Sequence, residues 1–519
     1  MKKLNRTDPR LFQEECLAVW VYDRKYRGAI SASALELNAL LARLTFRNEN
    51  WWGLKFRNVA SALGHGSPSA NESTLARIRV AEDLRIKHPA DAVAKSMGAF
   101  KALPKAEDFA TLFGYSVDYA SNVNSIVQHE SALVSKIKAA KVELEPKTLI
   151  DHVYAYIVGK GFNFKREEVA NFYLALRTKP FVILAGISGT GKTQLPSLFA
   201  EATGMSDDQV IQVAVRPDWT DGGDLIGYVG LDDAFKPKDL TLAIQRAKKD
   251  PNKPYFFILD EMNLARVEHY FSDFLSVIES RKRKDGRIVT RPMIREESIA
   301  SATNRDDFEG LTWPENLYLI GTVNMDETTH AFSRKVLDRA NAIEMNDVDL
   351  SWPKNGAKVE TWTGIHNDAL RTEYLIANEL SMEDRALLES TEVMTTMKAV
   401  NEILKNADLH FAYRVRDEMA FYLLLNLRFE LMELDDAFDF QLMQKVLPRI
   451  NGSSSRTERV LLDLLKLLAG IDIAGTDHKT ADLEEKVKER GNKRYKRSVS
   501  KLLFMLRRFE EDRFTSFWL

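Results

Sequence analysis

The fold is decided by the stretch Gly186-Ile187-Ser188-Gly189-Thr190-Gly191-Lys192-Thr193, which is a complete G-x-x-x-x-G-K-T phosphate loop. Residues 181–185, just before it, form an apolar run with the length and the β-rich content of a buried parallel strand. A helical pattern begins at Gln194. The sequence therefore predicts a strand, a phosphate-binding loop and a helix in the order that a nucleotide site requires.

The residue types of this loop match the chemistry of a nucleoside triphosphate and its metal ion. Glycines let the backbone N–H groups turn inward around the β-phosphate, Lys192 reaches the β- and γ-oxygens, and the Thr193 hydroxyl ligates Mg²⁺. The predicted nucleotide-binding residues are Gly186, Ser188, Gly189, Thr190, Gly191, Lys192, Thr193 and Gln194. The alternative, a glycine-rich turn that matches by chance, is disfavoured by the flanking strand and helix.

Two further apolar runs deliver polar side chains that suit hydrolysis. Residues 255–259 are followed by Asp260, which we expect to hold Mg²⁺ through water, and by Glu261, which we expect to polarise the attacking water. Paired carboxylates after a strand also occur as simple solvated turn residues. Residues 317–323 are followed by Asn324, whose side chain is placed to hydrogen-bond the γ-phosphate or the lytic water.

Taken in order, these elements resemble the AAA+ family of ATPases. The resemblance implies an α/β fold with a P-loop αβα core and a helical lid, and it makes Asn324 the sensor 1 residue. AAA+ rings place an arginine finger at the end of the helical stretch expected at residues 331–340, where Arg339 is the first candidate and Arg334 the second. Arg414 resembles the sensor 2 arginine, which lies on the lid and contacts the nucleotide from above.

These arginines also have plainer interpretations. Arg334 and Arg339 fit the solvated face of a charged helix. Arg414 fits a structural ion pair with Asp417 or Glu418. The sequence leaves both alternatives open.

Within the AAA+ family the chain resembles the McrB branch, the motor subunits of modification-dependent restriction systems. Four stretches carry this resemblance, which covers roughly residues 150–519: residues 215–228, 260–271, 447–452 and 514–518. The branch is associated with GTP and with Met-Asn-Thr-Ala-Asp-Arg around sensor 1, whereas this chain has Val323-Asn324-Met325-Asp326-Glu327-Thr328. ATP with Mg²⁺ is therefore the expected cofactor, and GTP is the alternative.

Composition indicates an ordinary soluble protein. The chain has 519 residues, 45% of them hydrophobic and 29% charged, and its formal net charge is −2 from 73 basic and 75 acidic residues. Any binding to DNA must therefore use local basic patches, because no field of the whole molecule attracts polyanions. The single cysteine, Cys16, excludes an internal disulfide and fits a reducing compartment, and no run is long enough to span a membrane. We expect a cytoplasmic protein.

Changes in pattern along the chain predict four parts. They are a mostly helical N-terminal recognition or interaction domain (1–145), the AAA+ nucleotide-binding core (146–355), a helical lid (356–452) and a helical C-terminal tail (453–519). The nine histidines are scattered without metal-ligand spacing, and we find no nuclease motif. If cleavage is the output, it belongs to a partner chain.

Two segments are candidates for contact with a substrate. Residues 280–290 place Asp285-Gly286, a hairpin signal, among cations, which fits a hairpin that faces the pore of a ring and equally fits a solvated charged turn. Residues 44–58 mix aromatic side chains with cations, as in surfaces that stack on bases and hold phosphates. The plainer interpretation is that Trp51, Leu54 and Phe56 are core residues.

The leading hypothesis is a homo-oligomeric ring, hexameric in the usual AAA+ manner. An arginine finger cannot reach the γ-phosphate of its own subunit, so a neighbour completes the site. Hydrolysis in the ring would drive DNA translocation or remodelling for a McrC-like nuclease in antiviral restriction. The alternatives are a MoxR-like ATPase that remodels protein partners without DNA, and a nucleotide-gated binding platform with slow turnover.

Overall fold

The computed structural model describes residues 145–325, 330, 332–352, 358–473, 479–491 and 494–518, together with Ala18 and Val59. The chain divides between Glu143 and Leu144 into two units, and apart from those two residues all of the described positions lie in the second unit. The predicted N-terminal domain therefore lies outside the described residues, except for Ala18, Val59 and Glu145, and the aromatic segment 44–58 lies outside them as well. Both remain predictions.

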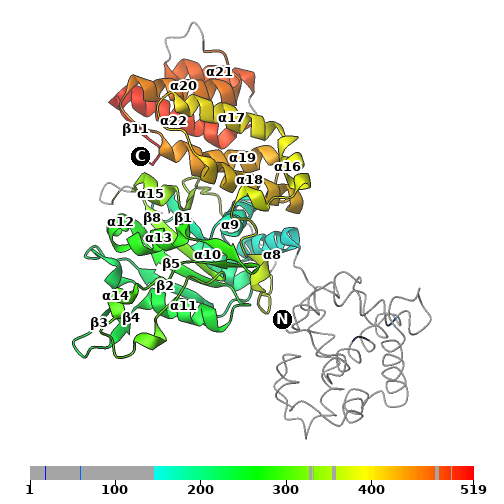
Figure 1. The fold of residues 1–519 in the computed structure, drawn as a ribbon. Coiled ribbons are helices and arrows are strands. Elements are labelled where there is room, and N and C mark those ends of the chain that lie inside the picture. The colour runs from blue at the N-terminus through cyan, green and yellow to red at the C-terminus, as the bar shows by residue number, and fades with distance from the viewer. Residues whose placement is uncertain are drawn as a thin grey trace. The chain divides into compact units, whose positions relative to one another are not determined.

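A five-stranded parallel sheet forms the centre of the second unit (Figure 1). Its strands, in spatial order, are β2 (Val210–Ala214), β5 (Tyr255–Asp260), β8 (Leu317–Asn324), β1 (Phe181–Gly186) and β9 (Asn341–Glu344). Each neighbouring pair is parallel. The carboxyl ends of the strands therefore meet at one edge, the carboxyl edge, and the segments that lead into the strands meet at the opposite edge, the amino edge.

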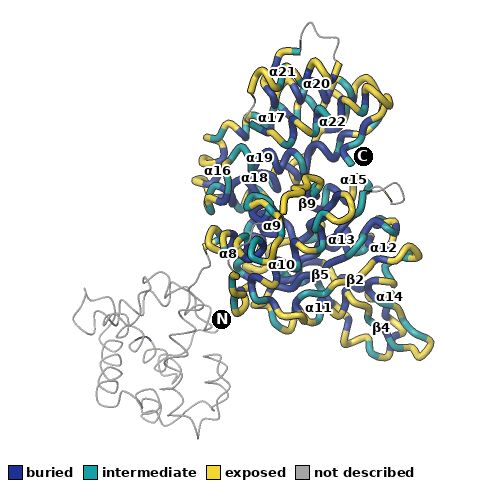
Figure 2. The backbone as a smooth tube through the Cα atoms, turned by 180° about the vertical axis from the view of Figure 1, so that it is seen from behind, coloured by how far each residue is buried: buried dark blue, intermediate teal, exposed yellow. Residues whose placement is uncertain are grey.

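Helices cover both faces of the sheet because successive side chains of a strand point in opposite directions. Val182 and Leu184 belong to one core, and Phe181 and Ile183 belong to the other. The first core includes α8 (Pro146–Gly159), α9 (Arg166–Thr178) and α10 (Gln194–Ala202); the second includes α11 (Asp239–Lys249), α12 (Val267–Tyr270), α13 (Ser272–Glu279) and α15 (Arg334–Leu337). Figure 2 shows the buried backbone between these layers. The predicted αβα core is confirmed.

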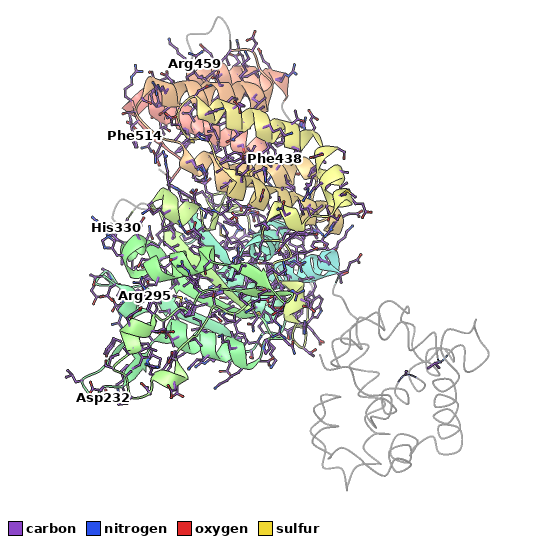
Figure 3. The ribbon with its side chains drawn as sticks, viewed as in Figure 1. Asp232, Arg295, His330, Phe438, Arg459 and Phe514 are labelled. Carbon is purple, nitrogen blue, oxygen red and sulfur yellow. The ribbon has the colours of Figure 1, made fainter. Side chains whose placement is uncertain are left out.

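Short elements interrupt the core. Two hairpins are formed by β3 (Gly227–Val229) with β4 (Phe235–Pro237) and by β6 (Lys282–Lys284) with β7 (Arg287–Val289), and α14 (Glu296–Ile299) follows the second. Asp232, in the turn of the first hairpin, lies at the end of the unit away from the C-terminal helices (Figure 3). The predicted turn of the second hairpin is confirmed, because Asp285 and Gly286 have φ values of 51° and 79°, as a two-residue hairpin turn requires.

The C-terminal half of the unit is a helical region. It contains α16 (Met382–Glu389), α17 (Glu392–Lys405), α18 (Tyr413–Phe429), α19 (Leu434–Gln441), a π-helix (Leu442–Val446), α20 (Ser455–Ala469), α21 (Thr480–Arg490) and α22 (Lys496–Asp512). Short 3-10 turns lie at Asp207–Gln209, Gly222–Asp224, Met262–Leu264, Arg305–Asp307, Asn367–Ala369, Ala377–Glu379 and Leu447–Arg449. None of the helices in the described segments has the length and apolar character needed to cross a bilayer.

The helices expected in the lid and those expected in the tail pack together. α19 contacts both α18 and α22, and α17 contacts α20. β10 (Asn451–Gly452) pairs antiparallel with β11 (Thr515–Ser516). Two stretches that resemble McrB, residues 447–452 and 514–518, thus meet in one small sheet, and lid and tail form one body.

A buried ion cluster joins this helical region to the sheet. The carboxylate of Glu418 on α18 contacts Lys179, which precedes β1, and accepts a hydrogen bond of 2.7 Å from Lys445 of the π-helix. Their side chains are 9%, 5% and 1% exposed, respectively. We call Lys179, Glu418 and Lys445 the buried triad.

Charge compensation keeps the carboxylate of the triad ionised. Burial by itself raises the pKa of Glu418, but the two ammonium groups and their hydrogen bonds overcome this effect and lower it to about 2. Burial lowers the pKa of Lys179 to about 7, and the other cations nearby add to this effect while Glu418 opposes it. One carboxylate thus forms ion pairs with two buried ammonium groups.

The free energy of unfolding should therefore depend on the ionised carboxylate of Glu418, and this contribution should be lost in acid. Its folded pKa lies below the ordinary 4.5, so the contribution is complete above pH 4.5 and is lost as the pH falls towards about 2. Removing one partner of a buried ion pair costs about 3–5 kcal/mol, because the remaining charge is left uncompensated. The free energies of unfolding of the wild type and of Glu418→Gln, measured with urea, should differ by about this amount at pH 7, and the difference should become smaller below pH 4.5. A gap that does not change between pH 7 and pH 3 would contradict this.

Candidate nucleotide site

The phosphate loop lies at the carboxyl edge, directly after β1. Gly189 and Gly191 have φ values of 85° and 87°, which other residues rarely adopt, and a Cβ on Gly191 would lie 2.9 Å from the ring of Phe164. The buried ammonium group of Lys192 donates a 2.5 Å hydrogen bond to the carbonyl oxygen of Ile187 in the same loop. The loop is thus curved around its own lysine, which suits the enclosure of a phosphate.

A hydroxyl and a carboxylate meet beside the loop. The Thr193 Oγ1 atom donates to Asp260 Oδ1 over 2.9 Å, and Thr322 Oγ1 donates to the same oxygen over 2.6 Å. Mg²⁺ usually takes one or two protein oxygens and completes its shell with water and phosphate. Thr193 and Asp260 fit that requirement, and Mg²⁺ bound between them would neutralise charge on the phosphates.

A second carboxylate of the same edge contacts the next strand. Asn324 at the end of β8 donates from Nδ2 to Glu261 Oε1 over 2.9 Å, and Asn263 Nδ2 donates to the backbone oxygen of Asn324 over 2.9 Å. Glu261 has a φ of 53° and a ψ of 49°, a left-handed conformation that is costly for a residue with a side chain. The carboxylate of Glu261 is held by Asn324, where a water near the γ-phosphate could be polarised.

Three polar residues of this edge were not predicted from the sequence. Thr322 bonds Asp260 and also accepts the N–H of Glu261 over 3.1 Å. Asn346 Oδ1 accepts the N–H of Ile187 over 2.9 Å, and Gln212 Nε2 donates to Asp260 over 3.3 Å. Thr322 could have been found, because it lies two residues before Asn324 and strand residues two apart share a face.

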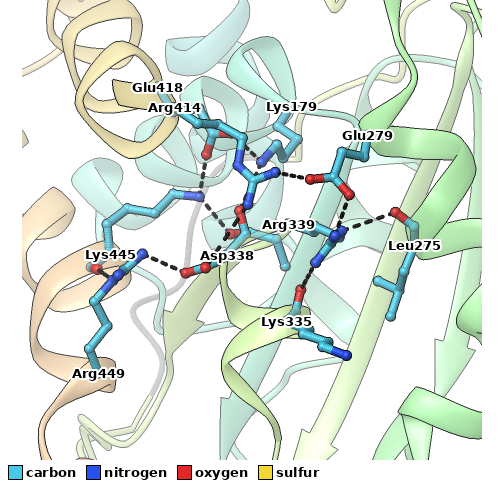
Figure 4. Close-up of polar contacts among 11 residues, drawn as sticks. Lys179, Leu275, Glu279, Lys335, Asp338, Arg339, Arg414, Glu418, Lys445 and Arg449 are labelled. Carbon is cyan, nitrogen blue, oxygen red and sulfur yellow. Dashed lines mark hydrogen bonds and ion pairs between the residues drawn. The ribbon is translucent and has the colours of Figure 1, made fainter. Parts of the chain in front are cut away.

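Two of the three candidate arginines, Arg339 and Arg414, lie at the amino edge. Arg339 precedes β9 and donates to the carbonyls of Leu275 and Lys335 over 3.0 and 2.8 Å. Its guanidinium also contacts Glu279 at the end of α13, and Arg414 Nη1 reaches the same carboxylate at 2.5 Å (Figure 4). Burial opposes the charge on Glu279, but the two arginines hold its pKa below the usual value.

Arg414 is thus grouped with the finger candidates rather than with the phosphate loop. Besides Glu279 it approaches Asp338 at 4.0 Å, whereas Asp417 is bonded by Arg416 and Glu418 by the lysines of the triad. The sequence predicts that Arg414 contacts the nucleotide from above, whereas in this structure its guanidinium contacts Glu279 at the amino edge. The cause is the packing of α18 against the amino edge, which the sequence does not reveal.

The segment that carries the finger candidates is less helical than expected. Among the described residues 332–340 the only helix is the single turn α15, and Arg339 lies after it. Arg334, the first residue of that turn, is exposed, whereas the side chain of Arg339 is 17% exposed. Residues 326–329 and 331 lie outside the described residues.

The cations of the β6–β7 hairpin differ in their availability. Arg283 donates to Glu379 over 2.9 Å, and the Nε and Nη1 atoms of Arg281 are buried. Lys282 and Lys284 are exposed. Only part of the predicted basic patch is therefore presented to solvent, and its role at a pore stays a prediction.

Comparison with known families agrees with this geometry. Residues 181–340 match the AAA domain of the dynein-related subfamily, a span that contains β1, the phosphate loop, the paired acids and Asn324. Residues 368–514 match a domain of unknown function, DUF8727, which covers the helical region that we describe as one body.

The chain is also similar to individual known proteins. The Type IV methyl-directed restriction enzyme EcoKMcrB subunit of Escherichia coli (strain K12) is 30% identical over 179 residues, which are 34% of this chain and 36% of that protein. The chain thus matches about a third of the length of that relative. An ATPase candidate from Cytophaga hutchinsonii has a TM-score of 0.32 at 16% identity, covering 69% of this chain and 98% of its own. A full-length MCM homolog from Methanopyrus kandleri has a TM-score of 0.33 at 12% identity, covering 58% and 60%.

The phosphate loop, the paired acids and the polar tip of β8, together with the family match, define an AAA+ ATPase. Within this class the chain resembles the McrB branch, because it is 30% identical to the restriction subunit over 34% of its own length. The expected AAA+ assignment is confirmed.

At the carboxyl edge, nucleotide binding and nucleotide hydrolysis depend on different residues. Glu261→Gln keeps the hydrogen-bonding shape but removes the base, so we expect kcat to fall by about 10²–10⁴-fold. The affinity for a fluorescent ATP analogue with Mg²⁺ should stay within about twofold, since Lys192 and Thr193 remain. Lys192→Ala is the comparison and should lose binding as well. Steady-state hydrolysis by Glu261→Gln at a rate close to the wild type would refute the assignment.

Proposed function

We propose that the protein is a ring-forming ATPase in which each nucleotide is hydrolysed with the help of a cation from the neighbouring subunit. The ring drives DNA translocation or remodelling for a McrC-like nuclease in a restriction system. ATP is the expected nucleotide and GTP the alternative. The identity to a methyl-directed restriction subunit supports the restriction context.

One observation carries the shared site. β1 separates the phosphate loop, at its carboxyl end, from Arg339 and Arg414 at the amino edge. Its six residues make five steps of about 3.3 Å, which is about 17 Å. An arginine side chain is too short to bridge that distance and reach the γ-phosphate of its own subunit. In a ring with heterologous contacts the amino edge of one copy can face the carboxyl edge of the next.

The three arginines would divide the work. Arg339 is held by two carbonyls and by Glu279, so we assign it to fixing the loop before β9. Arg334 is exposed and Arg414 is 41% exposed, so these two are available to a phosphate of the neighbour. Arg334 replaces Arg339 as our preferred finger.

Arg334→Ala should therefore lower kcat by about 10³-fold or more, as removal of an arginine finger does. Nucleotide affinity should change by no more than about twofold, because the phosphate loop is untouched. Arg305→Ala is the matched control: it removes an exposed arginine that pairs only locally with Glu309, and it should hydrolyse ATP like the wild type. Full activity of Arg334→Ala would exclude it as the finger.

The proposed contact with DNA can be tested at the β6–β7 hairpin. Lys282→Gln with Lys284→Gln removes two exposed cations of this hairpin, so the stimulation of ATP hydrolysis by duplex DNA should fall at least about tenfold while the basal rate is kept. Lys398→Gln with Lys405→Gln, on the exposed face of α17, is the control and should keep the stimulation.

The same assay separates the proposal from protein remodelling. Hydrolysis should rise with methylated or unmethylated duplex DNA and stay unchanged with an unfolded protein such as reduced casein. Stimulation by casein alone would favour the remodelling alternative, and stimulation by neither would favour a nucleotide-gated platform. Parallel measurements with ATP and GTP decide the nucleotide.

A further inference from the structure

The buried triad occupies the junction between the helical region and the segment that carries the candidate fingers. Lys179 donates to the carbonyl oxygen of Asp338 over 3.3 Å, and Lys445 donates to that of Ala340 over 2.6 Å. These two carbonyls flank Arg339. Each lysine of the triad thus contacts Glu418 and also fixes the backbone on either side of Arg339 (Figure 4). The fixed segment is joined to Arg334, because the N–H of Asp338 donates to the carbonyl oxygen of Arg334 over 2.9 Å.

The third member of the triad is on the same helix as Arg414. Glu418 follows Arg414 by four residues on α18, so the two side chains project from the same side of the helix, one turn apart. Anchoring Glu418 therefore sets the rotation of α18 and the direction in which Arg414 points. A shift of α18 would move Arg414 away from Glu279, which it contacts together with Arg339.

A second set of contacts continues from the same junction. The carboxylate of Asp338 accepts from Arg449 Nη2 over 2.5 Å, and Arg449 Nε donates to the carbonyl of Lys445 over 2.9 Å. The helical region is therefore fastened to the loop before β9 through both backbone and side chain. These contacts lie at the amino edge, remote from the phosphate loop.

The energetics of a buried ion cluster fit a geometric role for the triad, in addition to the cost of breaking it. Removing charges from water is costly, and a buried ion pair is often no more stable than well-packed apolar residues, but its hydrogen bonds demand one arrangement. Burial also opposes the charge on Lys445, as its lowered pKa indicates. An apolar contact at this junction would give comparable cohesion without fixing the direction of α18.

We propose that Glu418, Lys179 and Lys445 are positioning residues, which hold α18 and the segment 338–340 in one register so that Arg414 and Arg334 reach the nucleotide of the neighbouring subunit together. The inference rests on the shared site proposed above. The triad then acts on the site of the neighbour and leaves the phosphate loop of its own subunit unaffected.

Mixed rings test this directly. Glu418→Gln alone should reduce kcat at least about tenfold with an unchanged affinity for ATP. Glu261→Gln protomers bind ATP and keep the triad, so they can supply cations to a neighbouring Glu418→Gln site. In an equal mixture about a quarter of all sites are intact acceptors beside an intact donor, so activity should recover to about a quarter of the wild-type rate.

Controls separate the possible failures. Arg334→Ala mixed with Glu261→Gln should recover in the same way. If that pair recovers and Glu418→Gln does not, the triad is not a positioning device for the neighbour. If neither pair recovers and the rate per wild-type protomer is independent of protein concentration, the shared site itself is wrong.

Two more variants distinguish the loss of positioning from a general loss of folding. Lys445→Met leaves Glu418 paired with Lys179 alone and should show the same loss and the same recovery, so it decides if Glu418→Gln does not fold. Asp384→Asn removes the negative charge from a 2.7 Å ion pair with Arg428 within the helical region and should hydrolyse ATP like the wild type. Loss of activity in Asp384→Asn equal to that of Glu418→Gln would mean that general loosening, and not register, explains the effect.

Discussion

The length of a parallel strand separates the two halves of the proposed catalytic chemistry. The phosphate loop, Asp260 and Asn324 meet at the carboxyl edge of the sheet, whereas Arg339 and Arg414 share Glu279 at the amino edge. No rearrangement of side chains can close this distance within one subunit. Assembly is therefore built into the proposed mechanism, and the helical region acquires its importance because it carries one of these cations.

Sequence predicted the carboxyl edge well because its signals are local. The phosphate loop follows β1 and precedes α10, and the apolar runs before Asp260 and Asn324 are β5 and β8, as expected. The hairpin at Asp285-Gly286 followed from turn chemistry alone. These predictions needed only a few consecutive residues each, and parallel pairing then brings the strand ends together.

The amino edge could not be predicted in the same way. Arg414 lies far along the chain from Glu279, and only the packing of α18 places them in contact. The buried triad joins three segments with no sequence motif, and a lysine such as Lys179 before a strand is indistinguishable from a solvated one. The pairing of β10 with β11, which joins lid and tail, could not be predicted from the sequence either, although both stretches resemble the McrB branch.

In the proposed mechanism, a second copy of the chain completes each nucleotide site. The decisive measurement is the rate of ATP hydrolysis per protomer, recorded as the protein is diluted while its assembly state is followed by light scattering. We expect this rate to fall steeply as rings dissociate into monomers. A rate per protomer that stays constant down to demonstrated monomers would contradict it.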